Sequence, residues 1–378
     1  MKMGIVVAVI AFAVMVFIHE LGHFSAAKLF KIKVTEFAIG MGPAIFKKQK
    51  GETLYSLRCL PLGGFCSMEG ESEQSDDERS FSKAAWWKRF IVVFAGAFLN
   101  IVLGFVLLII VQSASANVVT TTIGGLEANA NMASAGFLEG DKIVKLDNTN
   151  INVFEDVSFF LNRVTDKEVK VRVKRGNETF ENTVKPVKRE IKYTYKEDKT
   201  DVSVYVNGVL ADNYEVGATQ DKRLIGTSDT QSGYILGFEG KSEKNSAFNV
   251  VSRSFYLTGF YVKMVYVSLY ELICGRVAAN QIAGPVGVVS MIGQASKINW
   301  KFLLDILALL TVNLGVMNLL PIPALDGCKL IVVLFEAVTK KKIPPEKEGI
   351  VNLIGFAILI GIMIFATYND IARLIFKR

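Results

Sequence analysis

The sequence predicts a multi-pass α-helical membrane protein that also carries a membrane-associated β-hairpin sheet and an inserted α+β domain. Hydrophobic residues make up 51% of the 378 residues, and the mean hydropathy is +0.35, which is high for a soluble protein. Apolar runs of about 18 residues or more recur along the chain, as expected of transmembrane helices. A polar stretch with strand-like segments separates two of these runs.

Four apolar runs are long enough to cross a bilayer and predict about four transmembrane helices. Residues 4–27 contain no Lys or Arg and a single acidic residue, Glu20. At about 1.5 Å per residue, a helix over this run would span a bilayer. The other runs are residues 90–111, 302–320 and 350–367. The alternative for the first run is a secretory signal peptide, but cleavage after it would discard every histidine of the chain.

The distribution of basic residues predicts the orientation of these helices. Residues 27–89 carry eleven Lys and Arg, whereas residues 112–141 carry none. The positive-inside rule therefore places the 27–89 loop in the cytoplasm and the region after the second helix outside the cell membrane. The net charge of +7 is explained by this topology, and no groove of interleaved basic and aromatic residues suggests a nucleic-acid partner.

Residues 1–113 are expected to form an N-terminal membrane part with the first helix, a β-hairpin over about 35–68, and the second helix. Short strand-like runs punctuated by Gly and Pro predict this hairpin. An exposed edge of such a sheet could pair with an extended peptide. The alternative is a cytoplasmic hairpin without any role in substrate binding.

Residues 117–187 are expected to form a compact extracytoplasmic domain that could extend to about residue 240. The pattern predicts strands at 118–123, 142–146, 168–173 and 179–184 and a helix at 154–164. Further strand-like segments lie at 202–206 and 234–238, and their pairing cannot be assigned from the sequence.

Residues 246–378 are expected to form a C-terminal membrane part with the third and fourth transmembrane helices. The apolar and aromatic segment 255–274 has Lys263 in its middle. An interfacial helix is favoured there over a fifth span, because an extra span would reverse the direction of the third helix.

The only two histidines of the chain lie four residues apart inside the first apolar run. His19 and His23 would face the same side of a helix and could share a metal ion. Glu20 completes a His-Glu-x-x-His motif, in which two His bind zinc and the Glu is the general base. A packed histidine pair and a proton relay are the alternatives. Ionisable groups this deep in a membrane are functional by default.

A catalytic zinc needs a third protein ligand, and Asp326 is the best candidate. It follows two prolines that end the third helix, in the segment Asn318-Leu-Leu-Pro-Ile-Pro-Ala-Leu-Asp326-Gly. The first and third helices are predicted to run inward, so His23 and Asp326 would lie at the same membrane depth. Asp305 and Asp370 are expected near the outer surface, and Glu36 and Glu52 are the next candidates. The alternative for Asp326 is a helix-capping role.

These two motifs together resemble the site-2 protease family of intramembrane zinc metalloproteases, in its bacterial RseP-like branch. Segments 40–43 (Gly-Met-Gly-Pro) and 61–65 (Pro-Leu-Gly-Gly-Phe) resemble the membrane-associated hairpin of that family. The external domain resembles a single PDZ domain, with residues 222–226 as a candidate peptide-binding strand. Two positions depart from the family pattern: Ala97 stands where proline often follows Ala-Gly, and Cys328 replaces a second glycine after Leu-Asp-Gly.

The resemblance implies a metalloendopeptidase with one zinc ion bound by His19, His23 and Asp326 and with Glu20 as the catalytic base. It further implies that Asn318, Gly40, Gly42 and Pro323 bind the substrate. The implied substrates are transmembrane segments of single-pass proteins already cut by another protease, such as anti-sigma factors or remnant signal peptides. The protein would contact membrane lipid, and its PDZ-like domain would bind a peptide end or exclude bulky substrates.

Three other functions are compatible with parts of the sequence. A membrane-anchored zinc protease that cuts soluble peptides would need its third ligand in a soluble helix. A metal or proton transporter would use the same ligands without Glu20. An adaptor built on a PDZ domain would need neither the histidines nor Asp326.

Overall fold

The computed structural model describes residues 2–71, 73, 75–127, 131–206, 209–217, 225, 227–276 and 283–376. The chain divides into two compact units, and each is described here by itself. Unit 1 comprises Met1–Ala114 and Tyr261–Arg378, and unit 2 comprises Ser115–Phe260. Helix α5 (Ala247–Ile273) continues from one unit into the other.

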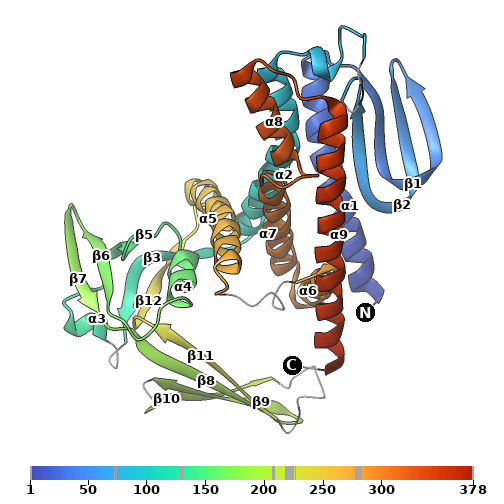
Figure 1. Ribbon diagram of the computed structural model, residues 1–378. Helices are drawn as coiled ribbons and strands as arrows, with labels where there is room; N and C mark the ends of the chain where they lie inside the picture. The colour runs from blue at the N-terminus through green and yellow to red at the C-terminus, as the bar shows by residue number, and fades with distance from the viewer. Residues whose placement is uncertain are drawn as a thin grey trace. The chain divides into compact units, whose positions relative to one another are not determined.

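Unit 1 is a bundle of helices (Figure 1). Within the residues that the structure describes, four of them are long and apolar enough to cross a membrane, which agrees with the expectation of about four spans. These are α1 (Lys2–Leu29), α2 (Trp86–Ser113), α7 (Trp300–Asn318) and α9 (Pro345–Phe376). Helix α5 is not among the four, and its interfacial placement stays a prediction. Two further helices, α6 (Pro285–Ile298) and α8 (Asp326–Thr339), were not expected from the sequence.

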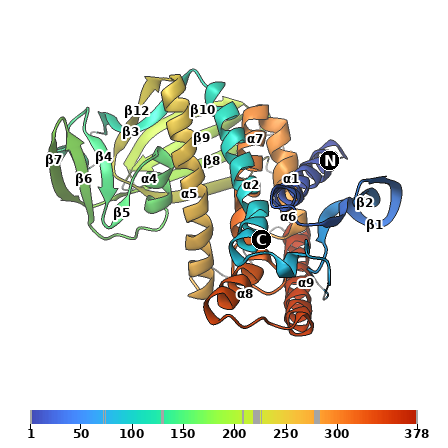
Figure 2. The same ribbon diagram turned by 90° about the horizontal axis from the view of Figure 1, so that it is seen from above.

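Helix α2 holds the bundle together, since it packs against α1, α7 and α8 (Figure 2). Small residues at the crossings allow the backbones to approach closely. A Cβ atom added to Gly22 would lie 2.3 Å from the Ala95 carbonyl oxygen, and one added to Gly315 would lie 2.7 Å from the Ala97 carbonyl oxygen. Larger residues at these two positions would force α1 and α7 away from α2.

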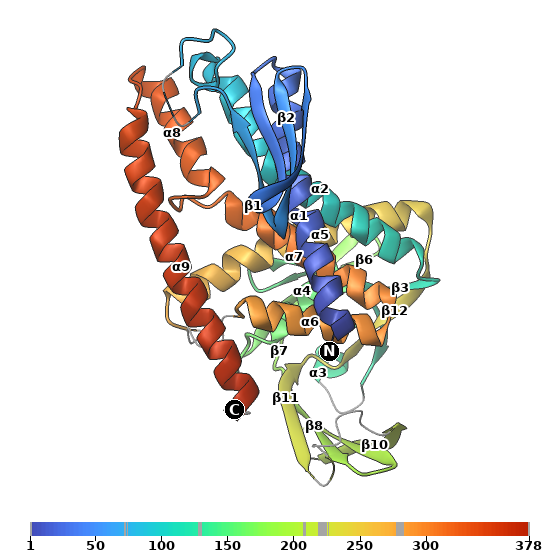
Figure 3. The same ribbon diagram turned by 90° about the vertical axis from the view of Figure 1, so that its right-hand side faces the viewer.

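The expected hairpin consists of β1 (Val34–Lys50) and β2 (Thr53–Met68), joined to α1 by a short turn and preceding α2. The first half of β1 lies between two segments of β2, because residues 36–39 pair with 64–67 on one side and with 54–57 on the other. Gly40 adopts a φ of 86° where β1 bends. Strand β2 lies along α1 (Figure 3), and at Gly64 it comes close to Glu20, the residue after His19.

Unit 2 contains a sheet whose strands lie in the order β12-β3-β4-β6-β7, with β5 paired to β4. Strand β3 spans Asn117–Leu126, β4 Lys142–Leu146, β5 Thr149–Asn150, β6 Val169–Arg175, β7 Glu178–Val184 and β12 Phe238–Lys244. Two helices, α3 (Asn131–Ser134) and α4 (Phe154–Leu161), complete this part. The strands expected at 118–123, 142–146, 168–173 and 179–184, and the helix expected at 154–164, are confirmed to within a few residues.

The core of this sheet is apolar, and an ion pair between a buried aspartate and a partly exposed arginine borders it. The core side chains are Ile123, Met132, Phe137, Ile143, Leu146, Val171 and Val173. Asp141 accepts two hydrogen bonds of 2.7 Å from Arg175. The Arg175 guanidinium holds the pKa of the Asp141 carboxyl below its usual range, so the charged pair persists at neutral pH.

The prediction of a single strand at 234–238 is wrong. Strand β11 (Ser228–Ile235) ends before Leu236-Gly237, and β12 begins after it. Gly237 has a φ of 80°, which lets the chain turn between the two strands. The first strand joins a second sheet of order β10-β9-β8-β11, whereas the second pairs with β3. Local composition could not reveal this break, because the two halves find their partners in different sheets.

The second sheet of unit 2 accounts for the strand-like segments whose pairing the sequence left open. Its other strands are β8 (Val187–Tyr195), β9 (Lys199–Val206) and β10 (Val209–Gly217). The segment 222–226, considered as a peptide-binding strand, lies outside the described residues except for Ile225. Among the described strands, the one that pairs with the outer edge of β3 is β12.

Candidate metal centre

His19, His23 and Asp326 lie together, although 303 residues separate the last two in the sequence. The Nε2 atoms of the two histidines are 3.2 Å apart. The Oδ2 atom of Asp326 lies 3.1 Å from His19 Nε2 and 3.3 Å from His23 Nε2. Both imidazoles are buried, with 8% of their surface exposed.

The three atoms are spaced as the ligands of one tetrahedral metal ion. Nitrogen and oxygen ligands at about 2.0–2.2 Å from zinc lie about 3.3–3.6 Å from one another in a tetrahedron, close to the spacing seen here. Asp326 Oδ2 is buried and receives no hydrogen bond from the described residues. Burial of an unpaired carboxylate oxygen is energetically unfavourable unless a proton or a cation binds to it. The donor set therefore fits zinc, with a fourth position left for water or substrate.

Helix α2 fixes the orientation of His23 through two residues one turn apart. The Nδ1 atom of His23 donates a hydrogen bond of 2.9 Å to the Val92 carbonyl oxygen, so Nε2 carries the lone pair that can bind a metal. Gly96 lies directly against the same ring, since a Cβ atom added there would be 2.3 Å from His23 Nε2. Only glycine leaves room for the imidazole at this crossing.

A short loop between α7 and α8 brings Asp326 to the histidines. Ala324 has a φ of 74°, a left-handed conformation that non-glycine residues rarely adopt. Its N–H donates to Asn352 Oδ1 on α9, which supports this conformation. A Cβ atom added to Gly327 would lie 2.2 Å from the Leu320 carbonyl oxygen, so the start of α8 can fold back only with glycine there. Asp326 is the first residue of α8.

An ion pair joins α8 to the helix that orients His23. Arg89 on α2 donates to Glu336 on α8 at 2.7 Å, and both side chains are about nine-tenths buried. Lys329 on α8 also pairs with Glu71 in the segment after β2. These contacts fix the helix that begins with Asp326 relative to α2.

Glu20 follows His19 directly in the sequence. Within the part of the chain that the structure describes, its carboxylate does not belong to the cluster formed by His19, His23 and Asp326. Its half-buried side chain lies against β2, since a Cβ atom added to Gly64 would be 3.4 Å from Glu20 Cγ. This position suits a carboxylate that transfers protons beside the metal and does not bind it.

The other carboxylates considered from the sequence have partners elsewhere. Glu36 accepts hydrogen bonds from Ser56 and Arg58. Burial raises the pKa of Glu36, but these hydrogen bonds outweigh burial and leave that pKa below its usual range. Glu52 pairs with Lys28, Asp305 accepts from Tyr261 Oη, and Asp370 accepts from the Gly287 N–H.

The residues expected to bind substrate lie in the hairpin and on either side of the turn that follows α7. Gly40 and Gly42 lie in the bend of β1, against Leu60 and Cys59 of β2. Asn318 is the last residue of α7 and is half-buried. Pro323 lies in the loop before Asp326 and touches α9 at Gly355. Their roles in substrate binding stay predictions.

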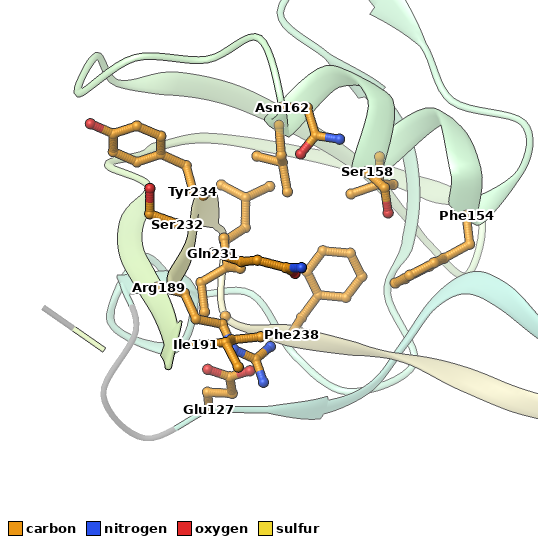
Figure 4. Close-up of a pocket in the computed structure, with 16 residues that line it drawn as sticks. Glu127, Phe154, Ser158, Asn162, Arg189, Ile191, Gln231, Ser232, Tyr234 and Phe238 are labelled. Atoms are coloured by element: carbon orange, nitrogen blue, oxygen red, sulfur yellow. The ribbon is translucent and has the colours of Figure 1, made fainter. Parts of the chain in front are cut away.

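Unit 2 contains a separate pocket of about 360 Å³ between α4 and strands β11 and β12 (Figure 4). Phe154 and Phe238 line its apolar part, and Arg189 lies beside Glu127 at one end. Arg189 Nε is buried and has no hydrogen-bond partner among the described residues. Strand β12, at the end of its sheet, forms part of the wall.

Comparison with known proteins identifies the family. Residues 7–362 match the profile of Peptidase family M50. The chain belongs to this family. It is 35% identical to a protein of Clostridium acetobutylicum that is named as a zinc metalloprotease, with 97% of each chain covered, and 34% identical to a protein of Clostridium perfringens that bears the same description, with 98% of each covered. It is 27% identical to the regulator of sigma-W protease RasP of Bacillus subtilis, with 98% of each covered.

As a family M50 peptidase, the chain is a metalloprotease whose cofactor is zinc, and it is a multi-pass membrane protein. The resemblance to site-2 proteases, inferred from the two motifs, is thereby confirmed. The motifs did not reveal the groups that hold the ligands in place, namely the Val92 carbonyl, Gly96 and the Arg89–Glu336 pair. In the sequence, Gly96 and the polar residue Asn100 lie four residues apart in the second span, and this spacing could have pointed to the role of helix α2.

We expect Gly96→Ala to weaken zinc binding by about 10-fold or more, a loss typical of removing the groups that orient metal ligands. The added methyl group would collide with His23 Nε2 and displace the ring. Zinc affinity, measured by competition with a chelator on the purified full-length protein, tests this.

Gly361→Ala is the matched control, because a Cβ atom at that position of α9 meets nothing within 4 Å. It should leave zinc affinity unchanged. Full zinc affinity in Gly96→Ala would show that His23 does not depend on the close approach of α2.

Proposed function

We propose that this membrane metalloprotease is an endopeptidase that cleaves the transmembrane segments of single-pass proteins at a zinc ion held by His19, His23 and Asp326. The observation that carries the proposal is the mutual spacing of 3.1–3.3 Å among the three ligand atoms. All three come from helices or helix ends of the membrane unit, and none comes from unit 2. A centre built in this way acts on peptide bonds within or at the edge of the membrane.

In this proposal each residue around the centre has its own role in peptide hydrolysis. Zinc, when bound, activates water and polarises the peptide carbonyl. Glu20, directly after His19 and against β2, takes a proton from the attacking water and returns it to the leaving amine. Asp326 and the two imidazoles would hold the zinc and take no proton in this exchange. The Val92 carbonyl keeps His23 in the tautomer that the centre requires.

The substrate segment must be unwound locally, because a peptide bond within a helix is shielded by its own turns. We propose that the unwound segment is held by the hairpin and by the loop before Asp326. Gly40 and Gly42 shape the bend of β1, while Asn318 and Pro323 flank the turn that delivers the third ligand. An extended peptide can bind the edge of a sheet such as this hairpin through backbone hydrogen bonds.

We propose that the protein lies in the bacterial cell membrane with its zinc centre towards the cytoplasm and unit 2 outside. The basic residues of the 27–89 loop support this orientation. Lipid would cover the outer face of α9, where Leu353, Ile358 and Ile364 are exposed. Similarity to RasP, whose name describes a regulator of sigma-W, supports substrates that control a sigma factor, such as anti-sigma factors. We propose that these proteins, or remnant signal peptides, reach the centre after a first cut by another protease.

We propose that unit 2 is a PDZ-like domain that selects substrates by binding a new peptide end or by excluding bulky proteins. The pocket beside α4 supports peptide binding, since edge strand β12 offers backbone hydrogen bonds and Arg189, which lies beside Glu127, has a buried Nε–H that finds no acceptor among the described residues. A peptide end with a free carboxylate is the ligand that this combination favours.

We expect Glu20→Gln to lower the cleavage of a transmembrane substrate by about 100- to 10,000-fold, the usual contribution of a general base. Its zinc content should stay at about one ion per chain, because the three protein ligands remain. Asp326→Ala should lower both cleavage and zinc content. The measurements are proteolysis of a reconstituted transmembrane substrate and metal analysis of the purified protein.

Asp305→Ala is the control for removal of a carboxylate from the same part of the chain, and it should keep its zinc. A metal or proton transporter would be indicated if Glu20→Gln retained its zinc while the wild-type protein cleaved no transmembrane or soluble peptide. Loss of zinc from Glu20→Gln as large as from Asp326→Ala would mean that Glu20 is a ligand.

We expect removal of residues 117–244 to preserve cleavage of a short, pre-trimmed substrate and to admit substrates with intact external domains. The ends of this deletion are adjacent, since the Asn245 N–H donates to the Ala116 carbonyl oxygen at 2.9 Å. A short Gly-Ser linker can therefore join them. Cleavage of matched trimmed and untrimmed substrates by both forms measures the effect. Equal rejection of untrimmed substrate by a zinc-loaded deletion protein would place the selection elsewhere.

We expect Arg189→Gln to weaken binding of a peptide with a free carboxyl end by about 10-fold, since a hydrogen bond to a charged group contributes about 1.5–3 kcal/mol. Fluorescence anisotropy with the full-length protein measures it, and the amidated peptide should bind weakly to both forms. Arg172→Gln, which removes an arginine paired with Glu181 outside the pocket, is the control. If the amidated peptide bound the wild-type protein equally well, the pocket would not recognise a carboxylate.

A further inference from the structure

Asn100 is a polar residue inside the second membrane-spanning helix, and it is completely buried. Its backbone carbonyl oxygen accepts a hydrogen bond from Thr311 Oγ1 on α7. Its side-chain Nδ2 atom lies 3.4 Å from His19 Nδ1, and its Oδ1 atom is buried without any partner among the described residues. Burial of an unpaired amide oxygen is energetically unfavourable, and polar residues inside membrane helices usually have a functional role.

Asn100 on α2 lies beside His19 in the same way that Val92 lies beside His23. Val92, Gly96 and Asn100 are spaced by four residues, so all three lie on the face of α2 that meets α1. Val92 accepts the hydrogen bond from His23 Nδ1, and Gly96 makes room for that ring. Asn100 reaches His19 at the corresponding nitrogen.

The chemistry of the imidazole decides which end of the Asn100 amide faces it. His19 Nε2 is the atom that lies beside Asp326 and His23, so it must carry a lone pair to bind the metal. The proton of the neutral ring is then on Nδ1, which becomes a donor and needs an acceptor. The two ends of an amide have nearly the same shape, and only the oxygen can accept. Turned by 180°, Asn100 places its orphaned Oδ1 at that site.

We infer that Asn100 is the positioning residue of His19: its Oδ1 accepts a hydrogen bond from His19 Nδ1–H and holds Nε2 in the tautomer and direction that bind zinc. This inference rests on the zinc centre proposed above. It makes the two histidines equivalent, because each donates its Nδ1–H to an acceptor on α2, a backbone carbonyl for His23 and a side-chain amide for His19. Such acceptors are commonly worth about 10- to 100-fold in metal affinity.

Two variants of Asn100 separate this role from simple packing. Asn100→Leu keeps the size of the side chain and removes the acceptor, so zinc affinity should fall by about 10- to 100-fold. The absorption spectrum of the cobalt-substituted protein should also change, because the His19 ring is free to turn. Asn100→Asp keeps an acceptor at the same place. It should retain the zinc affinity and the cobalt spectrum of the wild-type protein.

Thr311→Val is the matched control, since it removes a buried hydrogen bond to the backbone of the same residue without touching His19. It should lower the thermal stability of the zinc-free protein and leave zinc affinity and the cobalt spectrum unchanged. Chelator competition, cobalt spectroscopy and thermal unfolding are measured on the full-length protein in detergent. If Asn100→Leu does not fold, Asn100→Ala, which also removes the acceptor, takes its place and should lose zinc affinity by the same about 10- to 100-fold relative to Asn100→Asp.

The inference is overturned if Asn100→Leu binds zinc as the wild type does. It is also overturned if Asn100→Asp loses as much affinity as a histidine variant, because the amide then donates and does not accept. His19→Ala distinguishes this failure from failure of the proposed function. If His19→Ala keeps full zinc affinity, the centre itself is wrong. If His19→Ala loses zinc while Asn100→Leu does not, only the role of Asn100 is wrong.

Discussion

The close packing of α1 against α2 is the constraint on which the zinc centre depends. Gly22 and Gly96 bring the two helix backbones so near that the His23 ring lies directly on the Gly96 backbone. At this distance the Val92 carbonyl can accept a hydrogen bond from His23, and Asn100 can reach His19. Two histidines on an isolated helix would be free to turn. Helix α2 fixes their direction before any metal binds, which lowers the cost of assembling the site.

The position of Asp326, the proposed third ligand, depends on a strained turn that the surrounding helices stabilise. Ala324 adopts a left-handed conformation just before Asp326, and Gly327 folds onto the end of α7. Such strain persists only where neighbouring contacts hold it. The hydrogen bond from Ala324 to Asn352 and the buried pair of Arg89 with Glu336 provide these contacts. Every helix that contacts the turn therefore contributes to the position of one carboxylate oxygen.

Much of the membrane unit could be predicted because each signal was local. Apolar runs gave the four candidate spans, and the i to i+4 spacing placed His19 and His23 on one helical face. The break after Ile235 could not be predicted, since strands β11 and β12 differ in their partners and not in their composition. Helices α6 and α8 were also missed, because both are too short to give the signal of a transmembrane helix.

The sequence by itself determined which chemical groups this protein has: two histidines, a neighbouring glutamate and an aspartate after a proline-rich helix end. Those residue types at those spacings have few other uses inside a membrane. Only the tertiary structure decided that Asp326 and not Asp305 or Asp370 meets the histidines, and that α2 places the Val92 carbonyl and Asn100 beside their other nitrogens. Distances between segments hundreds of residues apart are set by how helices pack, and no local pattern records that packing.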